Sequence, residues 1–305
     1  MIEIYTHEWK TVGVKLAEAM RDGKVSVEET CAAIIPVLDL LRSVFPDDAE
    51  FPARQGEYYH LDGQLRRAGQ AYQRALELDP PLALTEREAA AIRRHCPLLL
   101  TTETECFPLK DIAAVHHPTL PLIGYHLFWE DDFDFPDDYE PCDHEEIWVE
   151  YDPDKETVTR VMTFFHSSVI SSEDAVREAR ENGERPLVRI EWGKHGSLLN
   201  GWENIDIPMK NMSMQDWMRQ TYEHVKAGGR LPEHPLKRFW PRGYEGSYES
   251  YINFSDPVDP LLYLERKPLM FKSLHANAIL FTQAIPYNFH PKMEWPDRFA
   301  RALLD

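Results

Sequence analysis

The chain has 305 residues, of which 43% are hydrophobic, so it is long enough for one large domain or two ordinary ones with a substantial core. Its formal net charge of −19 argues against nucleic acid or an anionic membrane surface as main partner, because both bind basic patches. No secretory signal opens the sequence, and no apolar run approaches the ~18 residues of a transmembrane segment. We therefore expect a cytoplasmic protein with free cysteines and no transmembrane segment.

Residues 1–96 are predicted to form a helical domain. Apolar residues at helical spacing precede Gly23, and Ser26 with Glu29 forms a capping-box pattern that opens a helix over 27–45. Pro36 lies inside this second helix and is expected to kink or split it. A further helix is expected over about 85–95, where the sequence reads TEREAAAIRRH.

The segment 49–82 contains small and tyrosine residues at a spacing that resembles one tetratricopeptide repeat, a helical hairpin of ~34 residues. The residues that carry this resemblance are Gly56, Tyr59, Ala68, Tyr72, Ala75 and Pro80. A single repeat cannot bury its own face, so it needs the helices before and after it. Two interpretations stay open: a groove that binds a protein or peptide partner, or a helical cap that packs on a second domain.

From residue 97 the pattern changes to short apolar or alternating runs broken by Pro, Gly and Asp, which predicts an antiparallel β-sandwich over 97–305. The expected fold class is α+β, with two helices inserted in the sandwich, one capped by Ser171 or Ser172 and one by Ser213. The aromatic and basic region 231–251 is expected to form a lid or the wall of a pocket. The expected strands are 98–103, 121–129, 145–151, 157–166, 186–193, 248–254, 260–266 and 278–286.

A histidine and several acids stand where the strand over 145–151 begins. Alternation along a strand places His144 and Glu146 on one face, and His-x-Glu supplies ligand types that divalent metals accept. Other histidines lie within an aromatic strand or at the ends of further strands, and ten of the residues 130–146 are acidic. If these elements converge, we expect a divalent metal held by some of His144, Glu146, His166 and His195, with Asp143 and His126 as further candidates.

The segments YHLFWEDDFD, CDHEEIWVEYD, FFHSS and PLVRIEWGKHGS, within 121–199, are similar to a known domain. They resemble the domain related to vacuolar protein-sorting-associated protein 62, which is similar in turn to the necrosis-inducing proteins. The resemblance implies a β-sandwich that holds a divalent cation at one end in an acidic and histidine-lined pocket. It implies that Asp143, His144 and either Glu145 or Glu146 form the acidic-histidine element, with His166 and His195 as the other two histidines. The Gly-Asp-Trp segment of those families is missing here, which leaves the ligand set open.

Two functional hypotheses follow from these residues. The first is a metal-dependent enzyme of oxygenase or hydrolase type with a small-molecule substrate, because two histidines and a carboxylate leave coordination positions open on Fe, Zn or Cu. Glu150 is then the candidate general base. The second is a non-catalytic binding or scaffold protein, in which the helices bind a partner and the acidic loop holds a hard cation such as Ca²⁺ or Mg²⁺, or no metal. The metal content of the purified protein separates the two hypotheses.

Overall fold

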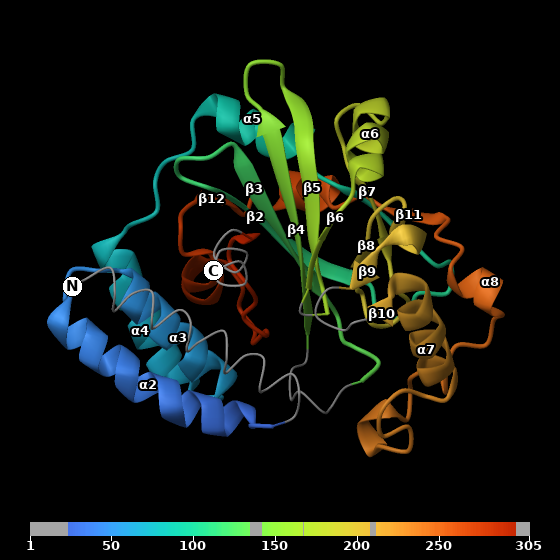
Figure 1. Cartoon of the computed structure of the whole chain (residues 1–305), viewed down its shortest axis with the longest axis horizontal. Coiled ribbons are helices and arrows are strands. Elements are labelled where there is room, and N and C mark those ends of the chain that lie inside the picture. Colours follow the sequence, from blue (N-terminus) through green and yellow to red (C-terminus); the bar gives the residue numbers. More distant parts are fainter. Residues whose placement is uncertain (1–23, 135–141, 167, 208–211, 297–305) are drawn as a thin grey trace. The chain divides into compact units, whose positions relative to one another are not determined.

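The structure is a computed structural model that describes residues 24–134, 142–166, 168–207 and 212–296. The expected helix before Gly23 lies outside these described residues. The chain is of mixed α and β content and divides into two compact units. Unit 1 comprises 1–82, 273–286 and 290–305, and unit 2 comprises 83–272 and 287–289 (Figure 1). This division differs from the expected boundary at residue 96, because the helix after Thr85 belongs to unit 2 and the chain returns to unit 1 at Ser273.

The described part of unit 1 is helical. It consists of α2 (Val27–Val44), α3 (Glu50–Leu61), α4 (Leu65–Leu78), α10 (Ala276–Ile279) and the π-helical turn η3 (Leu280–Ala284). α2 begins at the expected capping box, in which the backbone N–H of Glu29 donates to the hydroxyl of Ser26 (3.0 Å) and the N–H of Ser26 donates to the Glu29 carboxylate (2.8 Å). The helix continues through Pro36, so the expected split is wrong.

Helices α3 and α4 form a hairpin whose close approach depends on Gly56. A Cβ atom at this position would lie 2.4 Å from Cδ1 of Tyr72, so only glycine leaves room for that buried ring. The ring of Tyr72 also contacts Phe281 of η3, with 5.5 Å between ring centroids. Asn277 of α10 donates to the carboxylate of Glu57 (2.9 Å), so late residues of the chain complete the packing of unit 1. The assignment of this hairpin as a tetratricopeptide repeat stays a prediction.

Unit 2 contains the β-sheets, which the topology divides into one sheet of six strands, one of four and one of two. The six-stranded sheet has the order β12 (Met270–Lys272), β2 (Leu109–His116), β3 (Leu122–Trp129), β4 (Asp143–Asp152), β5 (Thr157–Phe165), β6 (Ser168–Ser171). The four-stranded sheet has the order β11 (Asp256–Val258), β1 (Leu98–Thr101), β7 (Leu187–Ile190), β8 (Ser197–Leu198), and β9 (Asp206–Ile207) pairs with β10 (Met212–Ser213). The expectation of antiparallel strands throughout is wrong for two pairs, because β12 runs parallel to β2 and β7 runs parallel to β1. In both pairs a long stretch of chain separates the two strands, which is what a parallel crossover requires.

The helices of unit 2 are α5 (Glu86–Arg94), α6 (Glu173–Glu181), α7 (Met214–Lys226), α8 (Tyr248–Tyr251), α9 (Leu261–Arg266) and the 3-10 turns η1 (Trp202–Asn204) and η2 (Pro235–Lys237). The hydroxyls of Ser172 and Ser213 cap α6 and α7, as predicted. The strands expected over 248–254, 260–266 and 278–286 are wrong, since those segments contain α8, α9, α10 and η3. No described helix is both long and apolar enough to cross a membrane.

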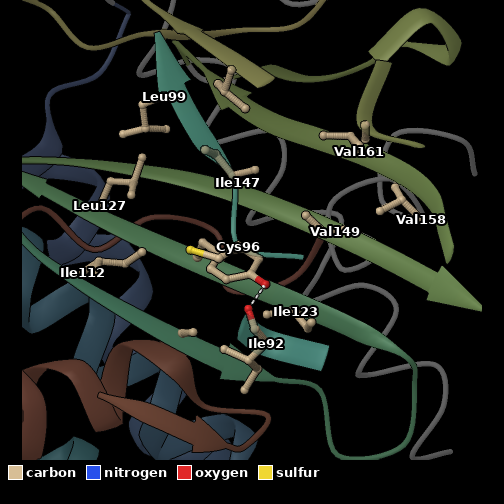
Figure 2. Packing of buried hydrophobic residues seen from close by; sticks show 14 of the residues in the cluster. Ile92, Cys96, Leu99, Ile112, Ile123, Leu127, Ile147, Val149, Val158 and Val161 are labelled. Carbon is tan, nitrogen blue, oxygen red and sulfur yellow. Dashed lines mark hydrogen bonds between the residues drawn. The ribbon is translucent and has the colours of Figure 1, made fainter. Parts of the chain in front are cut away.

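One buried apolar cluster includes residues of both larger sheets (Figure 2). Helix α5 adds Ile92, whose carbonyl accepts a hydrogen bond from the hydroxyl of Tyr125 (2.7 Å). Because side chains alternate along a strand, β3 presents its odd-numbered residues to this cluster and its even-numbered residues, among them His126, to the opposite face. The residues labelled in Figure 2 are Ile112, Ile123, Leu127, Ile147, Val149, Val158 and Val161 of the six-stranded sheet, Leu99 of β1, and Ile92 and Cys96.

Candidate functional site

Three of the predicted ligands meet where β3 pairs with β4. The register of the two strands places His126 opposite Glu146 and Phe128 opposite His144. Atom Nδ1 of His126 lies 3.1 Å from Nε2 of His144, and Nε2 of His126 lies 3.4 Å from Oε1 of Glu146. His126, His144 and Glu146 are all buried, and together they are called the strand-pair cluster below.

The surroundings of the strand-pair cluster are aromatic. Phe128 stacks on the ring of His144 with 4.8 Å between centroids, and Phe289 contacts the same ring edge-on at 5.2 Å. Burial in this environment lowers the pKa of His126 to about 3, so this imidazole is neutral at neutral pH. A neutral imidazole is the form of histidine that binds a metal ion.

Asp143 and His195 meet elsewhere, because Asp143 precedes His144 and so lies on the opposite face of β4. Atom Nδ1 of His195 is 2.9 Å from Oδ2 of Asp143, and its Nε2 is 3.5 Å from Oε1 of Glu105. Trp129 stacks on the imidazole at 4.3 Å. Burial by itself lowers the pKa of His195, but the hydrogen bonds to Asp143 and Glu105 outweigh burial and raise the pKa to about 10. His195 is therefore a buried imidazolium between two carboxylates.

His166 makes a third, separate pair. Its Nε2 lies 2.8 Å from Oε2 of Glu191, and the hydroxyl of Tyr251 donates to the other oxygen of that carboxylate (3.3 Å). Burial raises the pKa of Glu191, but the charge of His166 and its hydrogen bond outweigh burial and lower the pKa below its usual value. A Cβ atom at Gly196 would lie 2.6 Å from Oε2 of Glu191, so a larger residue there would displace this pair.

One tight loop, from Glu191 to Gly196, links the two pairs. The N–H of His195 donates to the carbonyl of Glu191 (2.9 Å), and the N–H of Glu191 donates to the carbonyl of Gly196 (3.0 Å). Both Gly193 (φ 66°) and His195 (φ 54°) have left-handed backbone conformations, which His195 adopts although it is not glycine. The loop thereby fixes the positions of Glu191 and His195 relative to each other.

Further ionisable groups, which sequence reasoning did not select, surround this loop. Lys194 pairs with Asp134, and Nε2 of His224 lies 2.6 Å from the same carboxylate. Burial, reinforced by the charge of Asp143, raises the pKa of Asp132 to about 7. The acidic composition of residues 130–146 is the only signal in the sequence that points to Asp132 and Asp134. Glu105, Lys194 and His224 lie in no pattern whose spacing is typical of metal ligands, so the sequence does not single them out. This loop cluster consists of Glu105, Asp132, Asp134, Asp143, His166, Glu191, Lys194, His195 and His224.

Glu150, the candidate general base, lies away from all these histidines. It is on β4, four residues after Glu146, which corresponds to about 13 Å along a strand. Its carboxylate is partly exposed and lies 3.5 Å from the guanidinium of Arg160 on β5. The structure therefore does not bring Glu150 to the predicted ligands.

The six predicted ligands thus fall into three places: the strand-pair cluster, the Asp143–His195 pair and the His166–Glu191 pair. Within the described ranges, no group of three or more His, Cys, Asp or Glu side chains is arranged to hold a metal ion. Two nitrogens do have a suitable spacing, since ligand nitrogens of tetrahedral zinc lie roughly 3.3 Å apart when each bond is ~2.05 Å. The 3.1 Å between His126 and His144 is close to that separation. A carboxylate facing the remaining ring nitrogen, as Glu146 does, is the usual support of a metal-binding histidine.

Comparisons with known proteins add no relative: no family model, no curated protein and no solved structure matches the chain. The resemblance to the domain related to vacuolar protein-sorting-associated protein 62 therefore stays a prediction that depends on short motifs. None of Cys31, Cys96, Cys106 and Cys142 is in a disulfide bond. The function has to be argued from the strand-pair cluster and the loop cluster themselves.

Proposed function

We propose that the protein binds a divalent transition metal through His126 and His144, on a β-sandwich formed by the two larger sheets of unit 2. The observation that carries this proposal is the pair of buried ring nitrogens 3.1 Å apart. At this distance one of the two nitrogens carries a proton and the other accepts it. A metal ion bound between the two nitrogens would take the place of that proton, which would move to the other nitrogen of the same ring. Imidazole nitrogen favours zinc, iron or copper over calcium or magnesium.

Glu146 has a supporting role in this proposal. Its oxygen Oε1 lies 3.4 Å from Nε2 of His126, and this negative charge favours a proton on Nε2, which leaves the lone pair on Nδ1, the nitrogen that faces His144. The aromatic rings of Phe128 and Phe289 keep water from the two nitrogens. A bound ion would supply a Lewis acid or a redox centre, which corresponds to the hydrolase or oxygenase activity on a small molecule that the ligand types indicate.

Elemental analysis of the purified protein tests the proposal. We expect stoichiometric zinc, iron or copper in the wild type and loss of that metal in His144→Ala and His126→Ala. His95→Ala is the matched control, because His95 is also buried but donates to the carbonyl of Glu184 (3.0 Å) and contacts the ring of Tyr151, outside the strand-pair cluster. Titration of Zn²⁺ into chelator-treated protein should show saturable binding at one site, measured by calorimetry. Metal content that is the same in His144→Ala and wild type would contradict the proposal.

A second candidate is a non-catalytic binding or scaffold protein, and one observation favours it. Among the residues that the structure describes, no three potential ligands are grouped for a metal ion. On this proposal the imidazole–carboxylate pairs only stabilise unit 2, and the helices of unit 1 bind a protein or peptide. Calcium or no metal in the purified protein, with an unchanged melting temperature after chelation, would favour this candidate. Four cysteines without a disulfide bond suit the cytoplasmic, reducing setting that we propose in either case.

A further inference from the structure

A cavity of about 440 Å³ lies in unit 2. Its lining residues Thr104 and Trp192 neighbour Glu105 and Glu191 of the loop cluster, but no described lining residue belongs to either cluster named above. Three segments line it: Thr102 to Thr104 after β1, Trp192 in the loop after β7, and residues between Pro241 and Asn253. The last segment falls mostly within 231–251, the region expected from the sequence to be a lid or a pocket wall. The volume of the cavity is within the range of small-molecule sites, which is ~300–1,000 Å³.

The floor of the cavity is aromatic and buried. Trp192 and Tyr244 are 2% and 5% exposed, and their rings meet edge-to-face at 5.1 Å. The indole N–H of Trp192 donates to the carbonyl of Thr104 (2.8 Å), which holds the ring in position. Thr102, another lining residue, is only 4% exposed, and its hydroxyl has no hydrogen-bond partner among the described residues. A buried hydroxyl of this kind is stabilised when a ligand or water supplies the missing hydrogen bond.

The wall of the cavity is built around two glycines. A Cβ atom at Gly243 would lie 2.5 Å from the carbonyl oxygen of Lys226, and one at Gly246 would lie 2.3 Å from the hydroxyl of Ser250. The hydroxyl of Tyr244 donates to that same Ser250 hydroxyl (3.0 Å). The sequence Gly-Tyr-Glu-Gly therefore lets the backbone pass close to α7 while it holds the tyrosine in the floor.

The rim of the cavity is polar and acidic. Glu103, Thr104, Glu245 and Asn253 are exposed there. None of the described lining residues is Lys, Arg or His. The two carboxylates repel a phosphate or a carboxylic acid, and they accept hydrogen bonds from hydroxyl or ammonium groups. An apolar floor below a ring of hydrogen-bond acceptors suits a molecule that has one apolar face and several hydroxyl groups.

We infer that this cavity binds a polyhydroxylated small molecule, a neutral sugar or an amino sugar, with its C–H face on Trp192 and Tyr244. Its hydroxyl groups donate to Glu103 and Glu245 at the rim, and Thr102 bonds the group that reaches deepest. This site does not depend on a metal ion at His126 and His144, so its occupancy is unchanged by chelation.

Ligand-observed NMR with the full chain and a chelator tests the inference, with millimolar glucose, glucosamine and glucose 6-phosphate as probes. We expect saturation transfer to glucose or glucosamine and none to glucose 6-phosphate, because the rim carboxylates repel the phosphate. Stronger transfer to glucosamine than to glucose would assign the amino sugar. No transfer to either sugar, or the strongest transfer to the phosphate ester, would overturn the inference.

Variants at the rim locate the site. Glu245→Gln combined with Asn253→Ala should weaken sugar binding at least 10-fold, and both residues are exposed, so folding should be preserved. Glu249→Gln is the control, because Glu249 is exposed on α8 but is not among the described lining residues. His144→Ala should leave sugar binding unchanged, which separates this test from that of the metal proposal. Equal binding by the rim variant and the control would show that the cavity is not the site.

Discussion

Two buried histidines of unit 2 show how partners decide the charge of a residue. His126 faces another imidazole and one carboxylate at 3.4 Å, and burial keeps it neutral. His195 lies between the carboxylates of Asp143 and Glu105, which keep it protonated although it is equally buried. The sequence context of the two histidines does not reveal this difference, because Asp143 and Glu105 come from other strands and loops.

The stability of the protein should depend on pH through His195. An unfolded histidine has a pKa near 6.5, whereas that of folded His195 is raised to about 10. The stabilisation is therefore complete below pH 6.5 and is lost as the pH rises toward 10, by at most about 1.4 kcal/mol per pH unit. Urea unfolding of the metal-free protein between pH 6.5 and pH 10 measures this slope. His195→Gln should be less stable at pH 6.5 and should have a shallower slope; equal slopes would show that His195 is not the responsible group.

At the scale of the element, the hairpin of α3 and α4 depends on one small residue. Gly56→Ala places a Cβ atom 2.4 Å from the ring of Tyr72, so we expect a loss of about 1–3 kcal/mol from overpacking. Gly69→Ala is the control on α4, because its Cβ would meet only Phe281, at 3.4 Å, and alanine favours a helix by up to ~1 kcal/mol. Thermal unfolding followed by circular dichroism compares the two variants. Similar melting temperatures for both would contradict the packing that we describe.

Local sequence signals predicted the elements that have clear caps or clear alternation. The capping serines of α2, α6 and α7 and the strands β1, β3, β4, β5 and β7 belong to this group, whereas β2 and β6 were not predicted. Short apolar runs without strict alternation misled the prediction after residue 248, where Ser247 caps α8 and the carboxylate of Asp259 accepts the N–H of Leu261 at the start of α9. Those two capping signals are present in the sequence, and they favour helices there despite the apolar content.

The candidate site was predictable only in part, for a similar reason. Alternation correctly placed His144 and Glu146 on one face of their strand, and His126 joins them through strand register. The three histidines do not converge. His144 faces His126, His166 faces Glu191, and His195 faces Asp143. The distance between strand ends depends on register and on loop conformation, and neither can be read from ligand types.

At the scale of the whole molecule, the two units are interleaved along the chain. The packing of unit 1 depends on residues after 273. Ala276, Ile279 and Leu280 of α10 and η3 are buried, and Arg54 forms an ion pair with Glu294 at 3.3 Å. We therefore expect a fragment of residues 1–96 to lack a cooperative thermal transition. A fragment in which a flexible linker joins residues 1–82 to 273–305 should show one by circular dichroism. A cooperative transition of equal midpoint in both fragments would contradict this expectation.

The return of the chain to unit 1 also affects the order of events on the ribosome. Glu57 can bond Asn277 only after a further 220 residues have been synthesised, and Arg54 can pair with Glu294 only after a further 240. At a synthesis rate of ~5–20 residues per second, this delay is about 10–50 s. During that interval the nascent helices expose the apolar surface that the late segment will cover. We therefore expect a chaperone to bind the first third of the polypeptide transiently during synthesis, even though this part of the chain is mostly helical once folded.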